Sequence, residues 1–384
     1  MMMTSRTRAI LIWLLVLTVL LLSACGPKKP KGEIIVYVAA PLSGFQANGG
    51  QTVLGGARLM AAQLNKAGGL LGYTVNVVGI DDESDSDVAV EVAEQIKADL
   101  QAGKKVIGVV GHYNSGQTLA AMEVYKDLPL IVITPTASEI SITQKGYTNF
   151  FRVNANDTVQ ARVDAEFLVN TVGARRVAVA YNDDPYGIGL GKLMAENLRR
   201  LGAEVPVELQ VAVEQSSFAE EVIKIAEANP EAIFYGGYEI EAPYLRAELV
   251  EAGITVPFLA SDGAFLAATI DEAAGTAEGI YVSAFGPTPA QAVDKDWIKE
   301  YQEVEYRNPD TYSINGYSAL AVLSEGIRKA GTVDDVARIA EAIRSLDFDT
   351  PIGHISYDAQ GDLRDPRIYI FQVRGGEFVQ VYPE

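Results

Sequence analysis

The segment Val106-Ile-Gly-Val-Val-Gly-His-Tyr-Asn-Ser-Gly-Gln-Thr118 begins as a continuous apolar run and ends in small polar residues. Leu130-Ile-Val-Ile-Thr-Pro-Thr-Ala-Ser138 repeats that pattern. Short apolar runs of this kind are typical of strands buried on both faces of a parallel sheet. Ser115 and Ser138 each precede a predicted helical run, so both are placed to cap a helix N-terminus. The free N–H groups at such helix starts also suit a carboxylate, so the roles of cap and of anion ligand both stay open.

The alternation of strand and helix continues on either side of these segments and indicates βαβ units on parallel sheets. The first series of alternating strands and helices ends around Phe150–Asn154, and a second series then begins. The chain is therefore expected to form two α/β domains. Strands are expected at Ile34–Ala39, Val75–Ile80, Val106–Val110, Leu130–Ile133, Val177–Tyr181, Val205–Val211, Ala232–Tyr235, Phe258–Ala260 and Gly279–Ser283. Helices are expected at Gly50–Ala67, Asp87–Ala102, Gln117–Lys126, Thr158–Thr171, Gly187–Leu201, Phe218–Ala228, Glu239–Ala252, Ser313–Lys329 and Val333–Ser345, before a β-rich tail over His354–Tyr382.

Residues 1–24 have the pattern of an export signal. Arg6 and Arg8 precede an apolar run from Ala9 to Leu22, which is too short for a membrane span of about 20 residues. Leu22-Ser-Ala-Cys25 closes this run and resembles the lipobox of bacterial lipoproteins, in which the cysteine is lipidated. We therefore expect a signal peptide over 1–24, a polar tether over 25–32, and an extracytoplasmic protein anchored to the cell membrane through Cys25.

Composition excludes several classes of partner. Removal of residues 1–24 takes away two arginines and changes the formal net charge of the chain from −19 to −21. So acidic a surface argues against nucleic acid, which requires basic patches. The 48% of hydrophobic residues is enough for a large core, and the length of 384 residues suits two domains.

The two halves of the chain carry polar residues at corresponding strand ends. Ser115 and Ser138 follow successive strands of the first half, and Tyr238 and Asp262 follow successive strands of the second half. Equivalent strand ends in two similar sheets would face each other across a cleft. Hydroxyls and helix N-termini on one side, with a phenol and a carboxylate on the other, match a ligand that carries both a carboxylate and an ammonium group.

A colinear series of motifs resembles the type I periplasmic binding proteins of ABC importers, in the subgroup that binds branched-chain amino acids. The resemblance covers nearly all of Glu33–Val381. Its motifs are Ala40-Pro-Leu-Ser-Gly44, Gly55-Gly-Ala57, Asn65-Lys-Ala-Gly-Gly69, Asp81-Asp82, Val110-Gly-His112, Ser115-Gly-Gln-Thr118, Phe151-Arg152, Asp157-Thr-Val-Gln160, Tyr186-Gly-Ile-Gly-Leu190, Tyr235-Gly-Gly-Tyr238 and Ser261-Asp-Gly263.

The resemblance implies an architecture and a function. The fold would be two doubly wound parallel-sheet domains joined by three hinge crossovers near Asn154, Phe285 and Arg367. The N-terminal lobe would comprise residues 33–155 plus 286–366, and the C-terminal lobe residues 156–285 plus 367–384. A monomer of this form would capture an amino acid, branched-chain or otherwise hydrophobic, and deliver it to the permease of an ABC transporter. Related receptors for amides or urea, short peptides or aromatic compounds, and a sensing module for a signalling partner, are the alternatives.

The resemblance also implies roles for individual residues. Ser115 and Ser138 would hold the ligand's carboxylate through hydroxyl and backbone N–H groups, the Thr136 carbonyl would accept from the ammonium, and Asp262 would supply the counter-charge. Gly49 stands where members of the family place a bulky aromatic residue, which predicts a roomier side-chain pocket. The remaining expected ligand-binding residues are Tyr113, Ala137, Tyr186, Tyr238 and Tyr312.

Signals for an enzyme are weak. Ser115 lacks the flanks of a G-x-S-x-G nucleophile, no phosphate-binding glycine loop is present, and His112 and His354 are the only histidines. A hydrolase would need a nucleophile–base pair that the sequence does not offer. Asp262 also has a second reading as the N-cap of a helix starting at Gly263. We expect a binding protein without catalysis, cofactor or metal.

Overall fold

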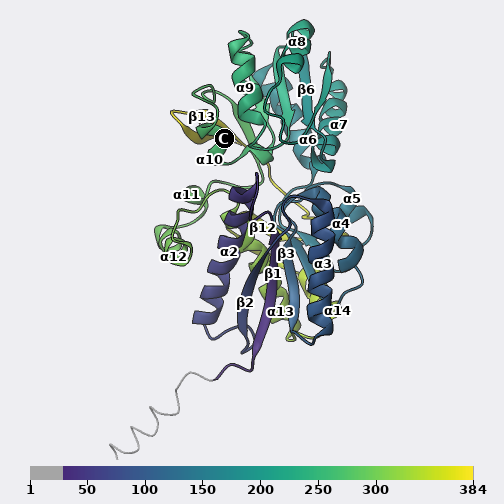
Figure 1. Ribbon diagram of the computed structural model, residues 1–384, viewed down its shortest axis with the longest axis vertical. Helices are drawn as coiled ribbons and strands as arrows, with labels where there is room; N and C mark the ends of the chain where they lie inside the picture. The colour runs from purple at the N-terminus through teal and green to yellow at the C-terminus, as the bar shows by residue number, and fades with distance from the viewer. Residues whose placement is uncertain (1–28, 384) are drawn as a thin grey trace, which may run out of the picture.

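The computed structural model describes residues 29–383, so Cys25 and the predicted signal peptide lie outside the described part of the chain. Two lobes are stacked along the long axis of the molecule, each with a central sheet between layers of helices (Figure 1). Within residues 29–383, no helix is both long enough and apolar enough to span a bilayer.

The first lobe contains an all-parallel sheet with the strand order β2-β1-β3-β4-β5. Its helices pack on both faces, and a small antiparallel hairpin of β11 and β12 lies outside the sheet. The strands are β1 (Glu33–Ala40), β2 (Thr74–Asp81), β3 (Val106–Gly111), β4 (Ile131–Thr134), β5 (Phe150–Arg152), β11 (Asp347–Thr350) and β12 (Gly353–Ser356). The helices are α2 (Ala47–Lys66), α3 (Ser86–Gln101), α4 (Ser115–Tyr125), α5 (Ser141–Gln144), α11 (Pro289–Ala292), α12 (Lys295–Glu305), α13 (Ser313–Ala330) and α14 (Val336–Arg344).

The second lobe repeats this order. Its parallel strands run β7-β6-β8-β9-β10, and two antiparallel strands from the tail, β13 and β14, extend the sheet beyond β10. The strands are β6 (Val177–Asn182), β7 (Glu208–Val211), β8 (Ala232–Gly236), β9 (Phe258–Ala260), β10 (Tyr281–Ala284), β13 (Tyr369–Arg374) and β14 (Glu377–Tyr382). The helices are α6 (Asp157–Glu166), which continues as a π-helical segment (Phe167–Val172), α7 (Pro185–Arg200), α8 (Ala219–Ala228), α9 (Ala242–Glu251), a 3-10 turn (Asp262–Ala264) and α10 (Ala267–Asp271).

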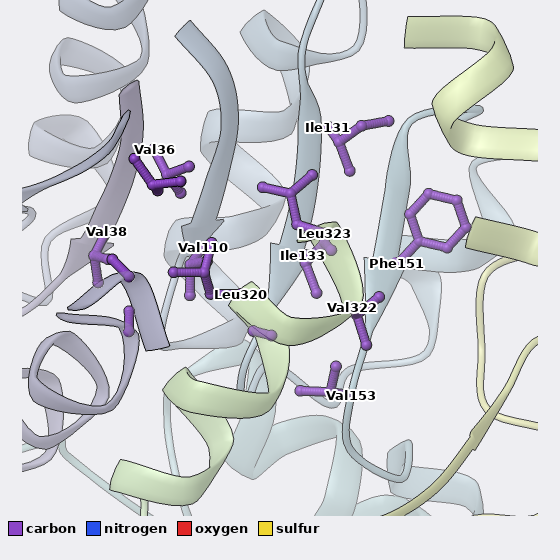
Figure 2. Close-up of a cluster of buried hydrophobic side chains, with 14 of the residues drawn as sticks. Val36, Val38, Val110, Ile131, Ile133, Phe151, Val153, Leu320, Val322 and Leu323 are labelled. Carbon is purple, nitrogen blue, oxygen red and sulfur yellow. The ribbon is translucent and has the colours of Figure 1, made fainter. Parts of the chain in front are cut away.

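Side-chain alternation along the strands builds the core of the first lobe. Val36 and Val38 of β1 point to one face and pack with α2, α13 and α14, whereas Tyr37 and Ala39 point to the other face and pack with α3 and α4. Figure 2 shows the first cluster, in which Leu320 and its neighbours on α13 face the aliphatic side chains of the sheet. Because both faces are covered, the strands are apolar at nearly every position, as the sequence predicted.

Most expected elements are present, and the differences have local causes. Helix α12 was not predicted, although its apolar residues Trp297, Ile298, Tyr301 and Val304 recur at helical spacing among charged residues. The hairpin of β11 and β12 begins earlier than the expected tail. Strands β1–β5 lie in the first sheet and β6–β10, β13 and β14 in the second, and helix α13, which lies between β10 and β13 in the chain, packs on the first sheet. The chain therefore passes between the lobes three times.

Candidate ligand-binding cleft

A cavity with about 270 Å³ of empty volume lies between the lobes, at the carboxyl ends of the parallel strands. This is the edge at which open α/β sheets bind ligands. Nine of the ten predicted site residues line it, and Gly49 lies behind Tyr113. The full lining is Tyr113, Asn114, Ser115, Thr136, Ala137, Ser138, Tyr186, Tyr238, Asp262, Gly263 and Tyr312.

The N-terminus of α4 opens into this cavity from the first lobe. Asn114 is its N-cap residue, but the Asn114 side chain bonds no helix N–H group and instead donates to Gln46 Oε1 at 2.6 Å. Ser115 is the first helical residue, so the prediction that its side chain caps this helix was wrong. The helix starts two residues earlier than expected, with its positive dipole end at the cavity wall.

The Ser115 hydroxyl instead organises the neighbouring loop. Its Oγ accepts from the backbone N–H groups of Ser138 and Glu139, both at 3.2 Å. Ser138 does not cap a helix either, because α5 begins only at Ser141. The N–H group of Ser138 that we expected to hold a carboxylate is therefore engaged by Ser115, whereas the Ser115 hydroxyl proton remains able to donate.

The strand-end loop after β4 is held rigidly. Thr136 Oγ1 donates to the Tyr113 carbonyl at 2.5 Å, and the Thr136 carbonyl already accepts from Asn154 Nδ2 at 2.9 Å. A carbonyl oxygen has two lone pairs, so this acceptor retains capacity for a second donor. The loop thus holds the Thr136 carbonyl at a defined position beside the cavity.

Asp262 is the charged group of the opposite wall. It is 5% exposed, and its Oδ1 accepts from the Tyr186 hydroxyl at 2.6 Å and from Gln160 Nε2 at 2.9 Å. Its side chain caps no helix, since Ser261 occupies the N-cap position of the short 3-10 turn and makes no capping bond. The alternative reading of Asp262 as a helix cap is therefore wrong.

The environment of Asp262 suits a cationic ligand group. Burial raises the pKa of Asp262 to about 6, and the hydrogen bonds from Tyr186 and Gln160 partly oppose that rise. No lysine, arginine or histidine lines the described cavity. Burial of a carboxylate without a cation costs free energy. A cationic group of a ligand in this cavity would pair with Asp262 and offset that cost.

Two tyrosines form the remaining wall of the second lobe. The rings of Tyr186 and Tyr238 are stacked, with centroids 5.6 Å apart and an interplanar angle of 17°. The Tyr238 hydroxyl donates to Asp184 Oδ1 at 3.0 Å, and the same carboxylate caps α7 by accepting from the Tyr186 N–H group. The pair is thus anchored at both hydroxyls and forms a flat aromatic surface.

Tyr113 and Tyr312 close the cavity from the first lobe. Their rings meet edge to face at 5.3 Å, and the Tyr312 hydroxyl donates to the Asp262 carbonyl at 2.6 Å, which joins the two lobes. A Cβ atom on Gly49 would overlap the Tyr113 hydroxyl. The roomier pocket expected from Gly49 is therefore not found, because the Tyr113 ring occupies the space beside this glycine.

Two polar residues near the cavity were given no role from the sequence. Gln160 bridges Asp262 and Ser283, with both bonds at 2.9 Å. Asp157 is fully buried beside Ser138, and burial raises its pKa to about 8. Both belong to the motif Asp157-Thr-Val-Gln160, whose exact spacing around the start of α6 was the only sequence signal for them.

The histidines are not placed for nucleophilic catalysis with Ser115. His112 is buried, with Nδ1 2.7 Å from Asp82 Oδ2 and Nε2 3.2 Å from the Tyr125 hydroxyl. His354 lies on β12 beside Asp349, in the hairpin outside the main sheet. Both partners of His112 are buried protein groups, so His112 stabilises the end of β3.

Comparisons with known proteins agree with this geometry. An amino acid binding protein of Pseudomonas aeruginosa is 31% identical over 337 residues, which is 86% of this chain and 88% of that protein. A Leu/Ile/Val-binding protein homolog of Brucella melitensis is 28% identical over 90% of this chain and 91% of its own length. A leucine-, isoleucine-, valine-, threonine- and alanine-binding protein of Pseudomonas aeruginosa is 29% identical over 86% of this chain and 87% of its own length.

The fold also matches solved structures. A leucine binding protein of Thermotoga maritima superposes with a TM-score of 0.82 at 24% identity, covering 91% of this chain and 97% of that chain. A branched-chain amino acid transporter substrate binding protein of Streptococcus pneumoniae in complex with isoleucine gives a TM-score of 0.79 at 23% identity, covering 91% and 100%. The sequence match to the periplasmic binding protein family extends over residues 34–377. With both lobes, the parallel sheets and the cleft between them in place, this chain belongs to the periplasmic binding protein family.

Proposed function

We propose that this protein captures an amino acid, branched-chain or otherwise hydrophobic, in the cleft between its lobes and delivers it to an ABC transporter. The observation that carries this proposal is that hydrogen-bond donors line one wall of the cavity and a carboxylate lies on the opposite wall. The α4 N-terminus and the Ser115 hydroxyl lie on one wall, and the buried carboxylate of Asp262 lies on the other.

A zwitterion fits both walls at once. Its carboxylate would receive hydrogen bonds from the α4 N-terminus and Ser115, and its ammonium would pair with Asp262 and the Thr136 carbonyl. Such charge-assisted hydrogen bonds are short and strong in a cavity that excludes water. The stacked rings of Tyr186 and Tyr238 then offer an apolar surface, which suits an aliphatic ligand.

The polarity of the cavity walls limits the alternatives. Aromatic acids and other carboxylates without an amine would leave Asp262 buried and without a partner. Amides and urea could meet Asp262 as donors, but they would leave the anion-binding wall of α4 unused.

The names of the relatives support an amino acid as the ligand. Three relatives that resemble this chain over most of its length are named as binding proteins for amino acids, among them leucine, isoleucine and valine. A sensing module that reports ligand to a signalling partner is the second candidate. Genes for a permease and an ATPase beside this gene would support the transporter, and a sensor kinase gene would support the sensor.

Closure of the lobes is part of the same proposal. We place the N-terminal lobe at 33–155 plus 286–366 and the C-terminal lobe at 156–285 plus 367–384, with hinges near Asn154, Phe285 and Arg367. The contact between the Tyr312 hydroxyl and the Asp262 carbonyl supports a closed state that ligand would stabilise. The protein would act as a monomer, with no cofactor and no catalytic step.

The anchor at Cys25 belongs to this proposal as well, because Cys25 ends the lipobox and is the only cysteine. Cys25→Ser should abolish lipid labelling and leave the precursor uncleaved at that site. Labelling with a radioactive fatty acid and fractionation of cells would measure both effects. A mature Cys25→Ser protein retained normally in the membrane would refute the anchor.

The decisive experiment is isothermal titration calorimetry of the soluble form, from Gly26 onward, with each common amino acid and with urea and acetamide. We expect saturable one-to-one binding of at least one aliphatic amino acid. Binding of urea or acetamide without binding of any amino acid would contradict the proposal.

A further inference from the structure

A chain of buried hydrogen bonds leads from the cavity carboxylate of Asp262 into the second lobe. Gln160 Nε2 on α6 donates to Asp262 Oδ1 and to Ser283 Oγ, both at 2.9 Å. The Ser283 hydroxyl on β10 donates in turn to Asp164 Oδ2, also at 2.9 Å. Gln160, Ser283 and Asp164 are fully buried, and none of the three lines the cavity. A ligand would therefore meet this chain only through Asp262.

The hydrogen bonds fix the direction in which the Gln160 amide points. An amide nitrogen carries two N–H groups, and here one is directed to Asp262 and the other to Ser283. Because the Ser283 hydroxyl donates to Asp164, its oxygen is free to accept from Gln160. The amide nitrogen, rather than the amide oxygen, is therefore the atom that faces the Asp262 carboxylate.

Packing alone does not account for a glutamine at position 160. The Gln160 Oε1 atom has no hydrogen-bond partner within residues 29–383. Burial of a polar atom without a partner costs free energy, and an apolar side chain of the same length would avoid that cost. The favourable contribution of Gln160 lies on the side of its nitrogen, because hydrogen bonds to a charged carboxylate are stronger than those between neutral groups.

Gln160 and Tyr186 together select one orientation of the Asp262 carboxylate. Both donate to Oδ1, and neither of these bonds uses Oδ2. The torsion that turns an aspartate carboxylate has broad minima, so a single bond would hold the group loosely. Two donors from different helices, α6 and α7, restrict this torsion and leave Oδ2 for a group inside the cavity.

We propose that Gln160 is a positioning residue of the cleft, which holds Oδ1 of Asp262 so that Oδ2 meets the ammonium group of the bound amino acid. This inference rests on the proposed function and adds to it a residue that acts through Asp262 without touching the ligand. Such preorganisation raises affinity, because the carboxylate loses no rotational freedom when the ligand binds. Ser283 serves the same end one bond further away, since it holds the amide of Gln160.

Calorimetry of the soluble form with leucine, isoleucine, valine and alanine would test this role. Gln160→Met removes the amide and keeps the length of the side chain. We expect it to weaken amino-acid binding by about tenfold, in line with the loss of one hydrogen bond to a charged group. Ser283→Ala leaves Gln160 in place and removes only its anchor, so we expect a loss of about threefold. The milder variant also provides the test if Gln160→Met does not fold.

The dependence of the Gln160 effect on Asp262 separates positioning from support of the fold. In the Asp262→Asn background the ammonium has no charged partner to be positioned, so the addition of Gln160→Met should change the affinity by less than about twofold. A glutamine that only supported the fold would weaken binding equally in both backgrounds. Shifts of the melting temperature at high amino-acid concentration extend the measurement to the weak binding expected of Asp262→Asn.

Asn197→Leu is the matched control. Asn197 is a buried amide on α7 of the same lobe, its Nδ2 donates to the Leu193 carbonyl at 2.7 Å, and it lies outside the lining of the cavity. Its replacement should leave the affinity unchanged. Wild-type affinity in Gln160→Met and Ser283→Ala, or an equal loss in both Asp262 backgrounds, would overturn the role of Gln160 alone. Absence of binding of every common amino acid by the wild type would overturn the proposed function and this inference together.

Discussion

At the scale of single residues, the cleft depends on carboxylates that the fold buries. Asp262 is held by Tyr186 and Gln160, and Asp157 lies beside Ser138. Burial raises the pKa of each carboxyl group, to about 6 for Asp262 and to about 8 for Asp157. The buried negative charge of each group costs free energy, and a cationic group of a ligand or a bound proton reduces that cost.

Asp262→Asn should weaken amino-acid binding by roughly two orders of magnitude or more. Asparagine keeps the shape and can still accept from Tyr186, but it cannot neutralise a buried ammonium, and stranding one member of a buried pair costs about 3–5 kcal/mol. The free energy of unfolding of the unliganded form should change little or increase, since a buried charge is removed. Calorimetry and urea unfolding would measure the two effects, and near wild-type affinity would refute the role of Asp262.

The substitution Asp157→Asn tests how burial of this carboxyl group makes the free energy of unfolding depend on pH. Because the folded pKa of Asp157, about 8, lies above the ordinary value of about 3.9, folding retains a proton that the unfolded chain releases. The stability from this group is complete below pH 4 and is lost as the pH rises through 8. We expect Asp157→Asn to be more stable than the wild type by about 1–3 kcal/mol at pH 8.5, with a smaller difference at pH 5.5. Urea unfolding at both pH values would measure this, and a difference between variant and wild type that is the same at both pH values would contradict it.

At the scale of elements, the two lobes are built by helices pressed closely onto the sheets and onto each other. Helices α2 and α13 approach so closely that a Cβ atom on Gly56 would overlap the Ser313 carbonyl, and one on Gly316 would overlap the Val53 carbonyl. This approach places the start of α13 at the cavity, and Tyr312 precedes that start. The glycines of α2 therefore help to position a residue of the cleft.

Gly56→Ala should destabilise the protein by about 3 kcal/mol or more, because its methyl group must displace backbone rather than a flexible side chain. Gly189→Ala is the matched control in a helix. A Cβ atom there would lie 3.5 Å from Asp157 Oδ2, an ordinary contact, so its higher helix propensity should leave the protein as stable or more stable. Thermal unfolding of both variants would measure the difference, and similar melting temperatures would argue against a tight α2–α13 contact.

At the scale of the whole molecule, two sheets of the same strand order face each other through their carboxyl ends. The chain passes between the lobes three times, and the Tyr312 hydroxyl joins them across the cavity. We propose that such a molecule opens by rotation of whole lobes, since most core residues of each lobe pack within that lobe.

Small-angle scattering should therefore show a decrease in the radius of gyration when a binding amino acid is added, because ligand binds the closed state better than the open state. Asp262→Asn at the same ligand concentration should show no such decrease. An unchanged radius for the wild type at saturation would contradict hinge closure.

The sequence alone determined the layers of the fold and most of the cleft. Apolar runs such as Val106–Val110, bounded by turn residues and rich in β-branched side chains, favour buried strands. Parallel strands of one sheet bring their carboxyl ends to the same edge. For that reason Ser115, Ser138, Tyr238 and Asp262, all just after strands, come to one cavity. Helix α12 was missed although Trp297, Ile298, Tyr301 and Val304 give it a helical period, because the segment is short and most of its other residues are charged.

Only the tertiary structure decided what these residues do there. Local spacing predicted capping for Ser115, Ser138 and Asp262, but side-chain partners depend on loops far apart in the chain, and Ser115 accepts from a loop 23 residues on. The Tyr113 ring fills the space beside Gly49 from a different strand end, which no local pattern reports. Periodicity follows from local geometry, whereas pocket shape and buried charge follow from contacts between segments that folding brings together.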